Sequence, residues 1–254
     1  LSVSEGTDFD YGIHGFQGGF DKAKVNGSSI FLYGGFIGKG SAEEDKKGIN
    51  ISTKQDLTYG GLYFTWAQDT TLVQNPAYLD IIGLYGDGNY KLDYRFGDTG
   101  QVYEKYKGSA YAFSIEAGKT FNRGKIGIEP QLQLVYSSAN HGDFIGSTGS
   151  DISRTSGDSI TGRVGIRIIK NTDRDSERKF SPYLRFNLLK QLSGNSDVNV
   201  DGASYVNKAD KLTYQAGIGA TYTLSNKVSL YGEFDYNWGG DKGWEGRIGG
   251  RYQW

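Results

Sequence analysis

Few residues in this chain could catalyse a reaction, and they are poorly placed for it. The chain has two histidines, His14 and His141, and no cysteine. Acid–base and nucleophilic sites commonly pair a histidine with a nearby acid or nucleophile. His14 lies beside glycines, His141 lies in a polar segment, and neither has a recognisable partner by spacing. We therefore expect no enzymatic activity and no thiol chemistry.

Two short motifs resemble ligand sites but lack the parts that would complete them. Asp197–Gly202 opens with the spacing of a calcium loop, but Lys208 occupies the twelfth position, where a bidentate glutamate is needed. Gly217-Ile218-Gly219 lies within a predicted strand, and no helix follows to complete a dinucleotide-binding fingerprint. We expect no metal and no cofactor. The net charge of −1 argues against a nucleic-acid partner.

Charged residues of both signs recur at the polar positions of segments in which every second residue is apolar. The charged residues that we expect to line a pore are Glu116, Glu129, Arg163, Arg185, Glu233, Asp235, Arg247 and Arg251. Arg167 and Glu245 share this face. Opposite charges on one face predict ion pairs between strands and a hydrated surface.

Strands must position these charges, because the alternation has a period of two. The clearest examples are 111–118, 126–136, 212–223 and 244–254, where apolar and polar side chains take opposite faces. Each runs to about the 9–11 residues that a tilted membrane strand needs. No apolar run of about 18 residues is present to form a transmembrane helix.

Composition is consistent with a membrane barrel. The hydrophobic content of 37% and the mean hydropathy of −0.53 would ordinarily indicate a soluble protein. In a barrel, however, half of each strand faces water and only the other half faces lipid. We predict an all-β, transmembrane antiparallel β-barrel of about eleven visible strands, forming a single domain over residues 1–254.

The connections also alternate in length. Asn122–Gly124 and Ser225–Asn226 are predicted as tight turns, whereas 86–104, 138–158 and 194–210 are predicted as long polar loops. Short turns at one end and long loops at the other are typical of outer-membrane barrels. In the first strand the apolar parity changes between Ile13 and Phe16, for which we expect a glycine-assisted bulge.

Several motifs in a fixed order resemble one family over essentially the whole chain. They are Gly15–Asp21, Ser114–Lys119, Ile128–Gln131, Gly162–Gly165 and Pro182–Leu184, followed by an ending with Arg247, Gly249, Tyr252 and Trp254. In order and spacing, the chain resembles the C-terminal translocator domain of classical autotransporters of type V secretion.

The resemblance implies a domain in the bacterial outer membrane that anchors and helps to export an N-terminal passenger. Its implied partners are the lipid bilayer, the passenger, periplasmic chaperones and the barrel-assembly machinery. The ending Arg247, Gly249, Tyr252 and Trp254 matches the signal that this machinery reads in the family.

The family barrel has twelve strands, preceded by an α-helix in the pore. Neither the helix nor the first strand is visible here, so we expect both to lie N-terminal to Leu1. Two other classes remain open from the residues alone. One is a general outer-membrane porin or adhesin barrel. The other is a soluble carbohydrate-binding β-protein, which would have to bury its aromatic faces or cover them with ligand.

Overall fold

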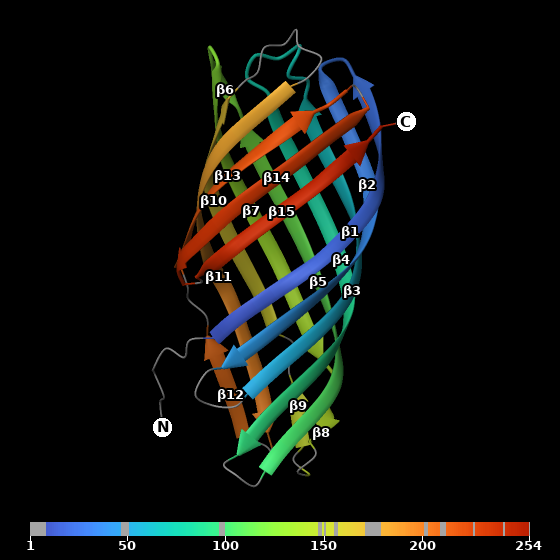
Figure 1. The fold of residues 1–254 in the computed structure, drawn as a ribbon, viewed down its shortest axis with the longest axis vertical. Coiled ribbons are helices and arrows are strands. Elements are labelled where there is room, and N and C mark those ends of the chain that lie inside the picture. Colours follow the sequence, from blue (N-terminus) through green and yellow to red (C-terminus); the bar gives the residue numbers. More distant parts are fainter. Residues whose placement is uncertain are drawn as a thin grey trace.

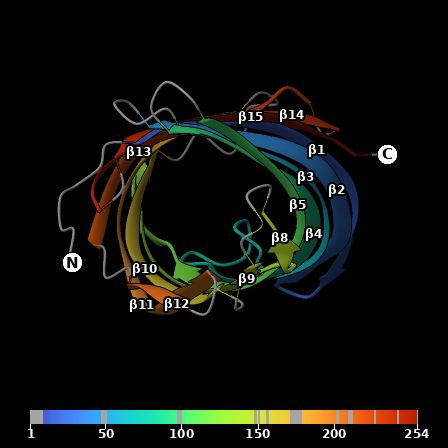
Figure 2. The same cartoon turned by 90° about the horizontal axis from the view of Figure 1, so that it is seen from below.

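The structure of this protein is a computed structural model. It describes residues 9–46, 51–96, 100–146, 149, 151–154, 157–170, 179–200, 203–208, 212–225, 227–240 and 242–253. Eleven of the described strands follow one another in a single antiparallel path. They are β1 (Phe9–Asn26), β2 (Ser29–Lys46), β3 (Ile51–Gln68), β4 (Ala77–Phe96), β5 (Gly100–Lys119), β7 (Ile126–His141), β10 (Gly157–Lys170), β11 (Lys179–Val200), β13 (Leu212–Thr223), β14 (Val228–Gly239) and β15 (Gly243–Tyr252). Viewed end-on, the path curls into a nearly closed ring (Figure 2).

Four short strands extend the sheet at its ends. β6 (Phe121–Arg123) pairs with β7, and β12 (Ala203–Lys208) pairs with the far part of β11. β8 (Phe144–Ile145) pairs with β9 (Asp151–Arg154), which also reaches β11. We call the end with the tight turns, Gly27 and Gly124 among them, the short-turn end. The opposite end, with β8, β9 and β12, is the long-hairpin end (Figure 1).

The two faces of the sheet invert the usual distribution of polar and apolar groups. The residues Phe113, Ile128, Ile166, Phe186, Ile218 and Phe234 are all exposed. By contrast Glu129 is 3% exposed, Asn187 5% and Asp235 1%. Among the described residues, the buried hydrophobic side chains are only Tyr90 and Val102. An exposed apolar wall around a buried polar interior is the arrangement expected where lipid replaces water outside.

Aromatic side chains gather at the two ends of this apolar wall. Towards the long-hairpin end the ring centroids of Tyr236 and Trp244 lie 4.3 Å apart and those of Tyr111 and Tyr136 lie 5.9 Å apart. Towards the short-turn end Phe180 and Tyr222 lie 6.4 Å apart. Amphipathic rings favour the two interfaces of a membrane, so these belts mark the band that lipid covers.

The path has two free ends, and they meet along one side of the barrel. β1 and β15 are the first and last strands of the path, with no hydrogen-bonded pairing between them among the described residues. Because each step along the path is antiparallel and there are eleven strands, β1 and β15 run in the same direction (Figure 1). We call the junction between them the seam.

The strands are longer than the sequence analysis predicted. The prediction of a loop over 86–104 is wrong, because β4 continues to Phe96 and β5 begins at Gly100. The predicted loop 194–210 is wrong in the same way, since β11 reaches Val200 and pairs with β12. Beyond the lipid a strand needs no apolar face, so polar and glycine-rich residues there do not end it. The third predicted loop, 138–158, contains β8 and β9.

The predicted bulge in the first strand is also wrong. The register of β1 against β2 runs without a break from Phe9 opposite Lys46 to Asn26 opposite Ser29. Ile13 and Phe16 lie on opposite faces of β1 and are both largely exposed. The parity change therefore comes from an apolar residue on each face of β1 and not from a bulge.

Candidate functional site

The polar face holds three linked clusters of side chains. The first surrounds Arg163 on β10, and we call it the Arg163 cluster. Its guanidinium donates to Glu116 Oε2 at 2.6 Å, to Gln133 Oε1 at 2.8 Å, to Asn187 Oδ1 at 3.0 Å and to Gln131 Oε1 at 3.2 Å. Each acceptor comes from a different position on β5, β7 or β11, so this one cation ties together four strands.

The second cluster surrounds Glu129 on β7, and we call it the Glu129 cluster. Its carboxylate accepts from Thr120 Oγ1 at 2.5 Å and from Gln131 Nε2 at 2.9 Å, and it pairs with Arg167 Nη2 at 2.7 Å. These contacts compensate a carboxylate that is almost completely removed from water, which would otherwise be costly. Gln131 belongs to both clusters and joins them.

The third cluster, the Arg185 cluster, lies on β11, β14 and β15. Arg185 Nε donates to Asp235 Oδ1 at 2.8 Å, Arg185 Nη2 pairs with Asp235 Oδ2, and Arg185 Nη1 lies 3.2 Å from Glu233. Glu233 also accepts from Tyr183 Oη at 2.7 Å and pairs with Arg247 Nε at 2.8 Å. The two-point pairing of Arg185 with Asp235 fixes geometry as well as charge.

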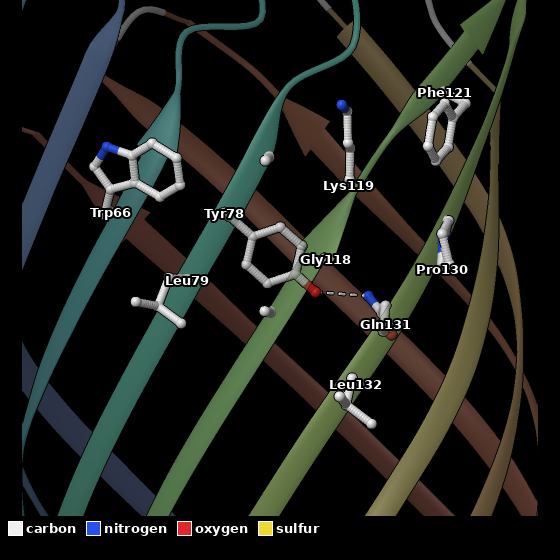
Figure 3. A pocket seen from close by; sticks show the side chains of 11 residues that line it. Trp66, Tyr78, Leu79, Gly118, Lys119, Phe121, Pro130, Gln131 and Leu132 are labelled. Carbon is white, nitrogen blue, oxygen red and sulfur yellow. Dashed lines mark hydrogen bonds between the residues drawn. The ribbon is translucent and has the colours of Figure 1, made fainter.

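Side chains in these clusters reach across an intervening strand. Arg163 on β10 crosses β7 to reach Glu116 on β5, and Arg185 on β11 crosses β13 to reach Asp235 on β14. Figure 3 shows Tyr78 of β4 reaching over β5 to Gln131 of β7, where the hydroxyl accepts from Nε2 at 2.9 Å. Side chains converge on the concave face of a curled sheet and diverge on the convex face. The charged face is therefore the inner one.

A glycine often lies beneath the side chain that crosses. Gly118 of β5 is paired with both Tyr78 and Gln131, and a Cβ at Gly118 would overlap the Tyr78 ring. Gly217 bears the same relation to Asp235, and a Cβ there would overlap its carboxylate. A glycine on the middle strand thus leaves room for side chains of the two flanking strands to form a hydrogen bond or ion pair above it.

A further crossing pair spans the seam. Arg251 Nη2 on β15 lies 2.5 Å from Asp21 Oδ1 on β1. Tyr63 Oη on β3 donates to Asp21 Oδ2 at 2.6 Å, crossing β2 at Gly34. Side chains join β1 and β15 here although no backbone ladder does.

The eight predicted pore-lining residues all take part in these inner-face contacts, but not in one site. Glu116 meets Arg163, Glu129 meets Arg167, and Arg185, Glu233, Asp235 and Arg247 meet one another. Arg251 belongs to the seam. The residues that sequence reasoning missed are four uncharged partners of these charges, Tyr78, Thr120, Tyr183 and Asn187, and the acid on the first strand, Asp21. Tyrosine opposite glycine on the polar face was the signal that could have found two of them.

The predicted assembly residues lie on β15 and at its end. Arg247 is on the inner face, whereas Tyr252 is exposed on the outer face. A Cβ at Gly249 would overlap the ring of Tyr231 on β14. Trp254 lies outside the described residues.

The other candidate sites gain no support from the structure. Among the described residues, no three histidine, cysteine or acidic side chains are grouped to hold a metal ion. The calcium-like motif begins on the β11–β12 hairpin, and its residues 201 and 202 lie outside the described residues. His14 is an exposed residue of β1, and the side chain of His141 is outside the described part. No helix in the described ranges is long and apolar enough to cross a membrane.

Comparison with known proteins agrees with this architecture. The family model "Autotransporter beta-domain" matches residues 2–235. Pertactin autotransporter of Bordetella parapertussis is 24% identical over 259 residues, which cover all of this chain and 27% of that protein. BrkA autotransporter of Bordetella pertussis is 22% identical, over 93% of this chain and 23% of that protein. The chain thus spans about a quarter of the length of these relatives.

Solved structures show the same fold. The β-domain of the Bordetella autotransporter BrkA superposes with a TM-score of 0.80 at 20% identity, covering 96% of this chain and 91% of that one. The transport unit of autotransporter AIDA-I from Escherichia coli gives 0.76 at 17% identity, covering 97% and 83%. The chain belongs to the autotransporter β-domain family, the translocators of type V secretion in the bacterial outer membrane, a family without catalytic activity.

Proposed function

We propose that this barrel exports and anchors an N-terminal passenger by way of two further elements, a strand in the seam and a helix in the lumen. The observation that carries the proposal is the ion pair between Asp21 and Arg251. Of the inner-face ion pairs, Arg163 with Glu116 and Arg185 with Asp235 have one strand between their partners, whereas Arg167 with Glu129 and Arg247 with Glu233 join neighbouring, hydrogen-bonded strands. Because β1 and β15 are not hydrogen-bonded to each other in the described chain, the seam pair matches the first kind, and one strand fits between them.

The direction of the flanking strands supports the same reading. β1 and β15 are parallel to each other, so one strand running the opposite way would pair antiparallel with both. Without it, two rows of backbone N–H and C=O groups would face hydrocarbon, where each unsatisfied group costs several kcal/mol. A strand from the segment N-terminal to Leu1 would satisfy both rows.

The lumen helix has a preferred place to dock. Glu129 and Asp235 are buried and Arg163 is partly buried, and all three are already bonded within the wall. Arg247 and Glu245 are 51% and 44% exposed, so they retain faces that a second element can contact. We infer that the helix docks against the β15 side of the lumen and makes few new contacts with the Arg163 cluster.

The unpaired edge of β15 also suits recognition during assembly. In the described chain β15 pairs on one side only, with β14, and an unpaired strand edge can accept another strand by backbone hydrogen bonding. We propose that the barrel-assembly machinery engages this edge together with Arg247, Gly249, Tyr252 and Trp254, after periplasmic chaperones deliver the chain. Trp254→Asp should then lower insertion in cells by more than its local contacts explain. Normal surface levels of that variant would refute this part of the proposal.

The test compares the 254-residue chain with the same chain carrying its native N-terminal extension. Single-channel conductance and heat-modifiable migration on gels are measured for both. We expect the extension to raise resistance to heat, by completing the ladder, and to lower conductance, by occupying the lumen. A 254-residue barrel that is equally stable, and whose conductance ignores the extension, would favour a general porin.

A further inference from the structure

A hollow on the outer wall takes no part in the proposed export, although Tyr78, Gly118 and Gln131 of the inner-face contacts also contribute to its lining. It is an open hollow of about 610 Å³ at the short-turn end of β3, β4, β5 and β7. Trp66, Leu79, Ala117 and Leu132 form one row across its floor and sides, because the four are successive partners in the sheet. Figure 3 views this groove from outside the barrel, with the opposite wall behind it.

The shape of the groove follows from the sizes of its residues. Ala77 and Ala117 are small and leave space above the sheet. Trp66 and Leu79 stand on one side of that space, and Phe121 and Leu132 stand on the other. The surface of the groove is therefore almost wholly apolar, as contact with an acyl chain would require.

Hydrogen bonds at the rim hold the groove in shape. Trp66 Nε1 donates to Ser29 Oγ at 3.2 Å, which directs the indole. The loop 69–76 is fastened to the next hairpin, since Thr120 N donates to Pro76 O at 2.8 Å and Asn122 N to Asn75 Oδ1 at 2.9 Å. A preformed groove loses little conformational entropy when a ligand enters it.

A single cation stands at the short-turn end of the groove. Lys119 Nζ lies 5.5 Å from the centre of the Phe121 ring. In the part of the chain that the structure describes, no carboxylate pairs with Lys119. In outer-membrane barrels short turns face the periplasm, so this ammonium lies at the level of the headgroups of the periplasmic leaflet.

We propose that this groove binds one phospholipid of the periplasmic leaflet. One acyl chain lies over Ala117 between Trp66 and Leu132, and the phosphate pairs with Lys119. The surrounding wall is immersed in lipid, which makes phospholipid the occupant at hand. An unpaired cation at the headgroup end of an apolar hollow selects a molecule with an anion joined to a hydrocarbon chain.

The experiment uses the intact protein, purified from outer membranes in a mild detergent and stripped of lipid. Native mass spectrometry counts the lipids retained as phosphatidylglycerol, phosphatidylethanolamine, diacylglycerol or inorganic phosphate is added. We expect one phospholipid to be retained at concentrations at which neither diacylglycerol nor phosphate is. Equal retention of diacylglycerol would overturn the role of Lys119, and retention of phosphate alone would overturn the role of the groove.

Two substitutions separate the apolar and charged parts. Ala117→Leu fills the groove and should weaken phospholipid retention more than tenfold, whereas Lys119→Gln should weaken it roughly three- to tenfold. Lys170→Gln is the matched control. It also removes a positive charge at the short-turn end of the barrel, from an exposed position at the end of β10 that lies outside the groove. Heat-modifiable migration shows that each variant is folded.

Equal lipid retention by all three variants would overturn the proposal. A dimer that is lost in Ala117→Leu while lipid binding is unchanged would assign the groove to a second copy of this chain instead, and would also overturn it.

Discussion

The Arg185 cluster and the seam use the same residue types in opposite settings. Asp235 is 1% exposed and its partner Arg185 16%, whereas Arg251 and Asp21 at the seam are 38% and 21% exposed. Both are arginine–aspartate pairs on the inner face, and both cross between non-paired strands. The difference is that β11 and β14, which carry Arg185 and Asp235, are each paired on both sides, whereas β1 and β15 each have one unpaired side in the described chain. The comparison teaches that burial, and not residue type, separates a structural contact of the wall from one that is open to another segment.

The largest effect should come from breaking the buried pair. Asp235→Ala leaves Arg185 with only Glu233 as an ion-pair partner in a largely buried site, and loss of one partner of a buried pair typically costs about 3–5 kcal/mol. Unfolding by urea in detergent micelles, followed by gel migration, measures the loss. The double variant Arg185→Met/Asp235→Leu is the control, and it should recover much of that stability. A double variant as unstable as Asp235→Ala would contradict this explanation.

The next largest effect should come from the outer face of the same strand, β14, at the position next to Asp235. Phe234 is exposed on the outer face of β14, next to buried Asp235. Phe234→Arg places a charge in lipid, which costs about 2–4 kcal/mol at mid-membrane. Insertion into vesicles and heat-modifiable migration should both fall. Phe234→Leu is the control, and if Phe234→Arg inserted as well as Phe234→Leu, this face would not contact lipid.

A smaller effect should come from blocking one crossing. A Cβ at Gly219 would overlap the ring of Tyr183, so Gly219→Val should displace Tyr183 from Glu233 at a cost of about 1–3 kcal/mol. In the background Tyr183→Ala the same substitution should cost much less, because the ring is gone. Urea unfolding of the four chains gives the coupling directly. Simple additivity would mean that the ring and the glycine do not depend on each other.

The seam pair should contribute less than the buried pair. Arg251→Ala removes a partly exposed ion pair, for which about 1 kcal/mol or less is expected. The loss should shrink as salt is added, since exposed pairs are screened. The measurement is urea unfolding at low and high salt. A loss as large as that of Asp235→Ala would show that the seam is as closed as the Arg185 cluster.

The smallest effect concerns the loop 69–76, outside the lipid band. Hydrogen bonds from Thr71 Oγ1 and Thr71 N hold the pKa of Asp69 below its usual 3.8. Because the folded loop lowers this pKa, the ionised carboxylate stabilises the loop at pH values above the usual pKa. That stability is lost as the pH falls through the lowered pKa. Amide exchange at Thr71, corrected for the intrinsic rate, should therefore rise only below about pH 4. In Asp69→Asn this dependence should vanish.

The alternation of residues was enough to predict the fold and the two faces, but not the individual contacts. Phe113 and Ile128 lie outside and Glu129 and Asp235 inside, as a period of two requires. The lengths of β4 and β5 could not be predicted, because the patterning that marks a strand within lipid is not needed beyond it. Which acid meets which arginine depends on the register between strands. Arg163 finds Glu116 across 47 positions of chain, and no local pattern encodes that distance.

The seam pair also has a consequence for the order of folding. Asp21 and Arg251 are 230 positions apart in the chain, and closing so long a loop is costly in entropy, so we expect their contact to form late, after the folding transition state. An interaction that is absent from the folding transition state does not change the rate of folding, and its loss appears as faster unfolding. Arg251 is thus expected to slow the opening of the finished barrel without speeding its formation, which makes the seam a determinant of kinetic lifetime.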